Sequence, residues 1–154
     1  MATTEYGPAG YLPPQAPGAN AGWWSRVGAS ILDGLIVLVP LFLGGAASAA
    51  GIDVLAGALT VAYFLAIVLY APILLTFNDG RTWGKRAADI RVVKEDGGPV
   101  GFGTAFGRET LKVIFGITGI LWFVDVLWPL WHPENRALHD LAAGTRVLTD
   151  RGTG

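Results

Sequence analysis

The distribution of apolar residues along the chain predicts two helices long enough to cross a membrane. Residues 27–50 form one apolar stretch of 24 residues that contains a single charge, Asp33, and residues 54–77 form another of 24 residues without any charge. At 1.5 Å per residue each helix would be about 36 Å long, which is enough to span a bilayer with some tilt. Because only residues 51–53 separate them, we expect the two helices to form an antiparallel hairpin.

A third apolar stretch, residues 113–131, is compatible with two arrangements. Its 19 residues just suffice for one crossing, but Gly116 and Gly119 interrupt it and Asp125 lies in its second half. It either crosses the bilayer once or forms two short helices that dip into the membrane and return. The second, broken or re-entrant arrangement is favoured, because it lets a short strand predicted at residues 145–149 pair with a strand that precedes the third stretch.

Basic residues are concentrated between the second and third apolar stretches. Residues 78–112 hold seven of the eleven Lys and Arg residues, whereas residues 51–53 hold none. Positive residues favour the cytoplasmic side, so we expect a basic cytoplasmic loop at 78–112 and a cytoplasmic N-terminus. Within this loop, residues 89–93 alternate like a strand and residues 100–102 are expected as its return strand, which predicts a small cytoplasmic β-hairpin-like patch.

The two ends of the chain differ in composition from the segment between them. Residues 1–23 are rich in Gly and Pro, which predicts a disordered cytoplasmic tail that serves as a spacer or as a docking peptide for a partner. Residues 150–154 form a second, short tail. We therefore expect one membrane domain at residues 24–149.

Composition supports a membrane protein and excludes several functional classes. Apolar residues make up 52% of the chain and charged residues only 15%, whereas soluble domains carry about 25% charge. The net charge of −1 gives no electrostatic basis for binding nucleic acid. The absence of Cys excludes disulfides, thiol catalysis and Cys-ligated metals. The predicted fold class is an all-α membrane protein whose main partner is the lipid bilayer.

Asp33 is the most informative charge, because a carboxylate in the middle of a membrane helix costs roughly 2.5–3.5 kcal/mol on insertion scales. It lies seven residues after Arg26, on nearly the same face of the helix. One interpretation is a structural lock, in which Asp33 pairs with Arg26 or with a basic residue of the third segment, such as Arg108 or Lys112. The other is a site that exchanges a proton or a cation. The sequence leaves both open.

The remaining titratable residues give weaker signals. Asp125 raises the same question as Asp33, with a smaller cost if it lies near the membrane surface. His139 and His132 lack the spacing of a zinc protease motif. His139 and Asp140 are adjacent on a short predicted helix, so we expect their side chains to point in different directions, which argues against a catalytic pair. We predict no metal, no cofactor and no enzymatic activity.

Several segments together resemble the RDD family of bacterial membrane proteins. Arg26, Asp33 and Asp140 resemble the Arg-Asp-Asp trio that gives the family its name. Ser25–Gly34, Thr82–Val93, Phe102–Arg108 and Ala137–Leu148 resemble its longer signatures. The resemblance covers about residues 24–149, and Ala88 departs from it, since Gly often stands at this position.

The resemblance implies a small helical protein of the bacterial cytoplasmic membrane, with a largely unassigned function and suggested roles in transport. It also makes Asp140 significant, because Arg26, Asp33 and Asp140 could form one charge cluster at the cytoplasmic mouth of the bundle. That cluster would either serve transport or fasten the C-terminal segment to the first helix. Arg108, Asp125 and His139 are secondary candidates for this site.

Two functions from different classes follow from the sequence. The first is cation/proton antiport through the intramembrane carboxylate Asp33, which would require a homo-oligomer because two or three spans make a poor pathway. The second is a non-transporting membrane adaptor or assembly module that binds a soluble or membrane-protein partner through its Pro-rich tail.

Overall fold

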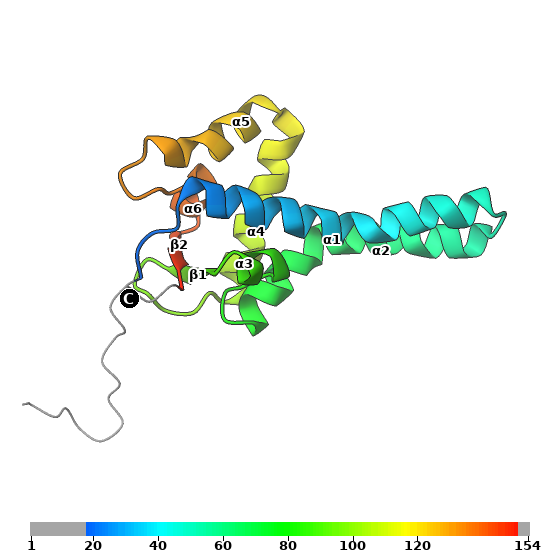
Figure 1. Ribbon diagram of the computed structural model, residues 1–154, viewed down its shortest axis with the longest axis horizontal. Helices are drawn as coiled ribbons and strands as arrows, with labels where there is room; N and C mark the ends of the chain where they lie inside the picture. The colour runs from blue at the N-terminus through cyan, green and yellow to red at the C-terminus, as the bar shows by residue number, and fades with distance from the viewer. Residues whose placement is uncertain (1–17, 151–154) are drawn as a thin grey trace, which may run out of the picture.

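A long helical hairpin is the most prominent feature of the computed structural model, which describes residues 18–150. Helix α1 (Trp23–Ala49) and helix α2 (Asp53–Phe77) run antiparallel and project from the rest of the molecule (Figure 1). Both are long and apolar enough to cross a membrane. The prediction of two such helices in a hairpin is confirmed, although α1 begins four residues earlier than expected.

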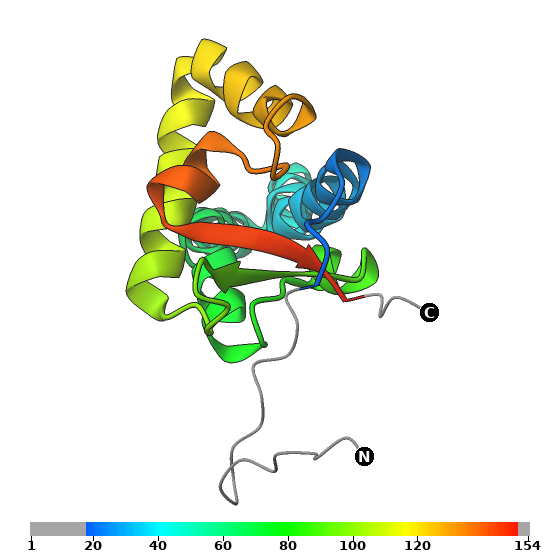
Figure 2. The same ribbon diagram turned by 90° about the vertical axis from the view of Figure 1, so that its left-hand side faces the viewer.

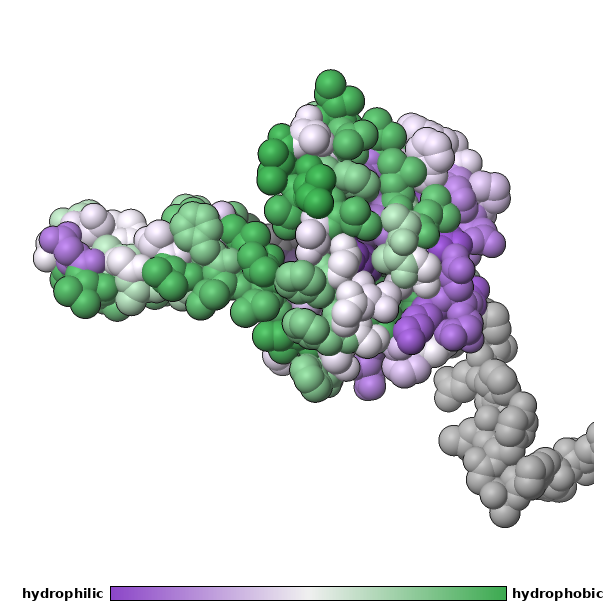
Figure 3. Space-filling model, turned by 180° about the vertical axis from the view of Figure 1, so that it is seen from behind, coloured by the Kyte–Doolittle hydropathy of each residue, from purple (hydrophilic) through white to green (hydrophobic). Residues whose placement is uncertain are grey.

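The surface of the hairpin is apolar and faces outward. In the most apolar window of each helix only 11% of the residues are buried inside the protein. Phe42 is 70% exposed and Val54 88% exposed, which would be unfavourable in water and is expected in lipid. Figure 3 shows hydrophobic side chains along the hairpin and on the adjacent part of the body, with hydrophilic ones at the opposite end. This distribution fits a bilayer that surrounds the hairpin.

The segment expected as a basic loop is largely folded. It contains helix α3 (Trp83–Ala87), which the sequence analysis did not predict, and strand β1 (Ile90–Lys94), which it did. The predicted return strand at residues 100–102 is wrong, because Phe102 already begins helix α4 and Val100 is buried in the core. Strand β1 pairs instead with strand β2 (Thr145–Thr149), antiparallel, with Val92 opposite Val147.

The third apolar segment is broken, as its glycines predicted. Helix α4 (Phe102–Thr118) and helix α5 (Ile120–Leu127) meet at Gly119, whose φ of +65° lies in the left-handed region that glycine adopts most easily. The helix begins eleven residues before its predicted start at residue 113, because the polar first half of α4 packs against α2 rather than forming a loop. A single 3₁₀ turn, η1 (Trp128–Leu130), follows α5, and helix α6 (Leu138–Ala142) leads into β2.

A small core holds the body together beside the hairpin. It consists of buried apolar residues from α1, α2, both strands and α4, and from the segments just before α1 and α4: Ala21, Ala29, Leu75, Ile90, Val92, Val100, Ala105 and Val147. The chain just before α1 runs beside β2, since the Ala21 amide donates to the Val147 carbonyl over 2.8 Å. Residues 18–23, expected as part of a disordered tail, thus include a residue that packs with the body, and residues 1–17 of that expected tail lie outside the described residues. Viewed along the hairpin, α4 stands on one side, α1 on the other, and α5 reaches from α4 toward α1 (Figure 2).

Candidate functional site

Asp140 is the centre of a buried ion-pair cluster that joins three helices. Its side chain, on α6, is 0% exposed. Arg26 on α1 donates from Nη1 to Asp140 Oδ2 over 2.5 Å, and Arg108 on α4 donates from Nε to Oδ1 over 2.9 Å. The contact between Arg26 and Asp140 expected from the sequence is therefore present, and Arg108 completes it from the other side.

Asp33, the third member of the expected cluster, lies in a separate one. Its Oδ1 accepts hydrogen bonds from the Tyr70 hydroxyl and the Gly84 amide, both over 2.8 Å. Its Oδ2 accepts a hydrogen bond from the Thr82 hydroxyl over 2.5 Å and lies 3.6 Å from the Lys85 ammonium nitrogen.

The expectation that Asp33 pairs with Arg26, Arg108 or Lys112 is thus wrong. Arg26 and Arg108 bind Asp140, and Lys112 binds Glu109. The N-terminal end of α3 comes close enough to Asp33 to supply an amide, a hydroxyl and an ammonium group. Because sequence patterning did not reveal α3, it could not reveal these partners.

Gly84 makes the approach of α3 to α1 possible. A Cβ atom at this position would collide with the carbonyl oxygen of Ala29 and would lie 2.8 Å from the Asp33 carboxyl. Only a residue without a side chain lets the α3 backbone donate directly to this carboxylate. The Gly84-Lys85 pair in the sequence therefore has a specific geometric role.

Asp125 and His139 form a third buried pair next to Asp140. Asp125 Oδ1 accepts the His139 backbone amide over 2.9 Å, and Asp125 Oδ2 lies 2.6 Å from His139 Nδ1. The other ring nitrogen, Nε2, lies 3.4 Å from Asp140 Oδ1. The expectation that His139 and Asp140 diverge is wrong, because the imidazole spans the distance between the two carboxylates.

Glu109 extends the charged network along α4. It binds Arg108 over 2.5 Å and Lys112 over 2.7 Å, and its side chain is 10% exposed. The sequence analysis did not single out Glu109, Lys85, Thr82 or Tyr70. A usable signal was present for Tyr70, since a hydroxyl in an otherwise apolar membrane helix needs a polar partner.

Opposing effects set the charge states of these groups. Burial would raise the pKa of Asp140, but the attraction of Arg108, His139 and Arg26 holds it well below its usual value. Burial lowers the pKa of His139 despite the nearby Asp140. Burial also lowers the pKa of Lys85 to about 8, and repulsion by Lys112 acts in the same direction. Lys85 is thus a buried amine that can lose its proton near physiological pH.

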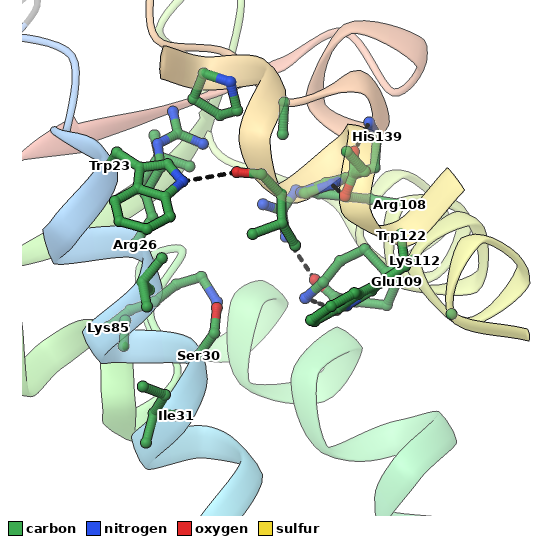
Figure 4. A pocket seen from close by; sticks show the side chains of 18 of the residues that line it. Trp23, Arg26, Ser30, Ile31, Lys85, Arg108, Glu109, Lys112, Trp122 and His139 are labelled. Carbon is green, nitrogen blue, oxygen red and sulfur yellow. Dashed lines mark hydrogen bonds and ion pairs between the residues drawn. The ribbon is translucent and has the colours of Figure 1, made fainter. Parts of the chain in front are cut away.

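A cavity of about 660 Å³ lies beside these clusters. Trp23, Arg26, Ser30 and Ile31 of α1 face Arg108, Glu109 and Lys112 of α4 across it (Figure 4). Lys85, Asp125 and His139 also line it, and the Trp23 indole donates to the Val126 carbonyl over 2.7 Å and so connects α1 to α5. Within residues 18–150, no group of three or more His, Asp or Glu residues could hold a metal ion. The charged side chains that line this cavity are chemically suited to bind a polar ligand and to exchange protons with it.

Comparisons with known proteins find a family and uncharacterized bacterial relatives. The chain is 36% identical over 136 residues to the uncharacterized protein YckC of Bacillus subtilis, and the match covers 82% of this chain and 83% of that protein. It is 32% identical to an uncharacterized protein of Haemophilus influenzae over 86% of this chain and 80% of the relative. No solved structure matches the chain. The RDD family matches residues 20–144, and this chain therefore belongs to the RDD family.

Proposed function

We propose that the protein exchanges a monovalent cation for a proton across the bacterial membrane, with Asp33 and Lys85 as the exchanging pair. The single observation that carries the proposal is the Lys85 ammonium nitrogen, buried and 3.6 Å from a carboxylate oxygen of Asp33. The protonated Lys85 amine provides the positive charge that compensates the Asp33 carboxylate. Loss of the proton would leave Asp33 without a compensating charge.

The surroundings of Asp33 suit a cation in place of the Lys85 ammonium group. Two hydroxyl oxygens, from Tyr70 and Thr82, lie within hydrogen-bond distance of the carboxylate. Carboxylate and hydroxyl oxygens are the ligand atoms that hard cations prefer. When Lys85 releases its proton, a monovalent cation can bind Asp33, and the total charge of the site is unchanged. The exchange is thus one proton for one cation.

The cavity gives access to Lys85, which is one of its lining residues. Three of the four acceptor positions of the Asp33 carboxylate are held by neutral donors, so its geometry persists while the charge beside it changes. A hairpin of two helices encloses no pathway by itself. We therefore propose a homo-oligomer in the cytoplasmic membrane, with the basic body on the cytoplasmic side as the distribution of Lys and Arg indicates.

Proteoliposomes with a trapped pH dye test this function when sodium, potassium and lithium gradients are imposed in turn. Wild-type protein should give cation-driven proton flux, and Asp33→Asn should abolish it. Lys85→Arg is the sharper variant, because Arg keeps the positive charge but does not release its proton. Lys94→Arg, at the end of β1 and outside the cavity, is the matched control and should retain flux.

Folding of each variant is checked by circular dichroism and size-exclusion chromatography in detergent. Wild-type flux in folded Lys85→Arg protein would rule out the proposed pair. The adaptor function expected as an alternative depends mainly on residues 1–17, which lie outside the described residues. Wild-type protein without flux would favour that alternative, and deletion of residues 2–17, which leaves the core residue Ala21 in place, followed by crosslinking would then test it.

A further inference from the structure

The cavity between α1 and α4 combines an apolar wall with buried basic groups. Its volume of about 660 Å³ lies within the range of about 300–1,000 Å³ that small-molecule sites occupy. The basic residues that line it are Arg26, Lys85, Arg108 and Lys112, and the acidic ones are Glu109 and Asp125. Such a combination suits a molecule with an anionic end and an apolar end.

Arg26 has a hydrogen-bond donor that the protein does not use. Its Nη1 binds Asp140 and its Nε donates to the Ala21 carbonyl over 3.2 Å. Its Nη2 is buried and has no hydrogen-bond partner among the described residues. A buried guanidinium nitrogen without an acceptor is unfavourable by roughly 1–3 kcal/mol. An oxygen atom of an anionic ligand would remove this penalty.

Lys112 provides a second positive group on the opposite side of the cavity. It binds Glu109 and is still 34% exposed. Among the charged neighbours of Lys85, Lys112 has the largest influence on its pKa, and this influence is repulsive. Asp140 and Glu109 already accept hydrogen bonds from Arg108 and Lys112, and Asp33 forms an ion pair with Lys85 over 3.6 Å. Each of these carboxylates is thus already engaged, whereas Arg26 keeps an unused donor and Lys112 remains partly exposed toward the cavity.

The apolar part of the cavity leads toward the membrane-facing surface. Its wall is formed by aliphatic and aromatic side chains of α1, α2, α4 and α5: Trp23, Val27, Ile31, Ile67, Val113 and Trp122. Ile31 is 59% exposed and Trp122 45% exposed, so the wall continues into the apolar surface around the base of the hairpin. A small hydrophilic anion would leave this wall uncovered, whereas an acyl chain would cover it.

We infer that this cavity binds an anionic phospholipid, with its phosphate between Arg26 and Lys112 and an acyl chain along Ile31 and Trp122. Basic pockets between membrane helices on the cytoplasmic side bind acidic lipid headgroups for the same physical reason. The proposed phosphate position between Arg26 and Lys112 does not use Asp33, although Lys85 lines the same cavity, and the binding test requires no ion gradient. Failure of one proposal therefore does not imply failure of the other.

The test measures binding to the full-length protein purified in a mild, uncharged detergent. Thermal unfolding and native mass spectrometry are recorded with phosphatidylglycerol, phosphatidylcholine and soluble glycerol phosphate. Phosphatidylglycerol should bind and raise the unfolding temperature, and the other two should not. Equal stabilisation by phosphatidylcholine would overturn the requirement for an anionic headgroup. Glycerol phosphate that binds as tightly would overturn the acyl-chain site and indicate a small-anion site.

Two variants probe the headgroup contacts. Lys112→Gln removes one positive group, and Arg26→Lys keeps the ion pair with Asp140 but removes the unused Nη2 donor. Each should weaken phosphatidylglycerol binding about fivefold or more, which corresponds to the loss of about 1 kcal/mol. Lys94→Gln removes the same charge outside the cavity and should leave binding unchanged. If Lys112→Gln and Lys94→Gln weaken binding equally, the lipid is attracted by general charge and the proposed site is wrong.

Discussion

The two clusters around Asp33 and Asp140 differ in the cations that hold the carboxylates. Asp140 is bound by the guanidinium groups of Arg26 and Arg108, which remain protonated at any pH the cell experiences. Asp33 is bound by neutral donors and one ammonium group, that of Lys85, which can lose its proton. The first cluster is therefore a permanent fastener between helices, and the second can change its charge.

The same difference separates the two roles, structural and functional, that were expected for the Arg-Asp-Asp trio. Arg26 and Asp140 fasten the C-terminal segment to α1, 114 residues away along the chain. Asp33 binds α3 through the Gly84 amide. Among the described residues, Lys85 is the charged group that pairs with its carboxylate. A structural role and a proposed exchange role thus belong to different members of one motif.

Asp140→Asn should have the largest effect on stability. It removes the carboxylate that Arg26 and Arg108 share, and breaking one side of a buried ion pair typically costs 3–5 kcal/mol. The expected outcome is a strongly lowered unfolding temperature in detergent, measured by circular dichroism. Asp53→Asn, at the exposed start of α2, is the control and should cost less than about 1 kcal/mol.

Gly84→Ala should have the next largest effect. The added methyl group meets the Ala29 carbonyl and the Asp33 carboxyl, so α3 must move away from α1. Overpacking of this kind costs about 1–3 kcal/mol. Gly103→Ala in α4 meets no atom within 4 Å and should be neutral or slightly stabilising. Equal unfolding temperatures for the two variants would show that α3 does not depend on this close approach.

Lys85 should give the protein a pH-dependent stability. Because its pKa is lowered from 10.5 to about 8 in the folded state, the unfolded chain binds more protons between these values. The free energy of unfolding should therefore rise between about pH 8 and pH 10.5, by at most about 1.4 kcal/mol per pH unit for one proton. Denaturant titrations of wild type and Lys85→Arg across this range measure it, and identical slopes would contradict the lowered pKa.

Tyr70→Phe should have the smallest effect of the four. It removes one of the three neutral hydrogen bonds to Asp33 and leaves the others in place. A loss of about 1 kcal/mol is expected. Tyr63→Phe is the control, since the Tyr63 hydroxyl makes no hydrogen bond with the described residues. If both variants unfold at the wild-type temperature, the Tyr70 hydroxyl does not contribute to holding the carboxylate.

Local patterns predicted the elements of the fold well where each element depends on its own residues. The hairpin follows from two uninterrupted apolar stretches, and the break in the third stretch follows from Gly116 and Gly119. Strand β1 was recognised by its alternation, and its expected pairing with residues 145–149 is confirmed, whereas the additional return strand at 100–102 is wrong because residues 102–118 are helical. Helix α3 has only five residues, too few to show a helical period.

The sequence by itself determined a hairpin of two apolar helices long enough to cross a membrane, a basic segment after it, and three charges that had to find partners. Only the tertiary structure decided which partners they found. Asp33 meets residues about 50 positions away in the sequence, and Asp140 meets residues from two helices. The physical reason is that hydropathy is set by the local chain, whereas ion pairing is decided by which helix ends the packing brings within about 4 Å of each other.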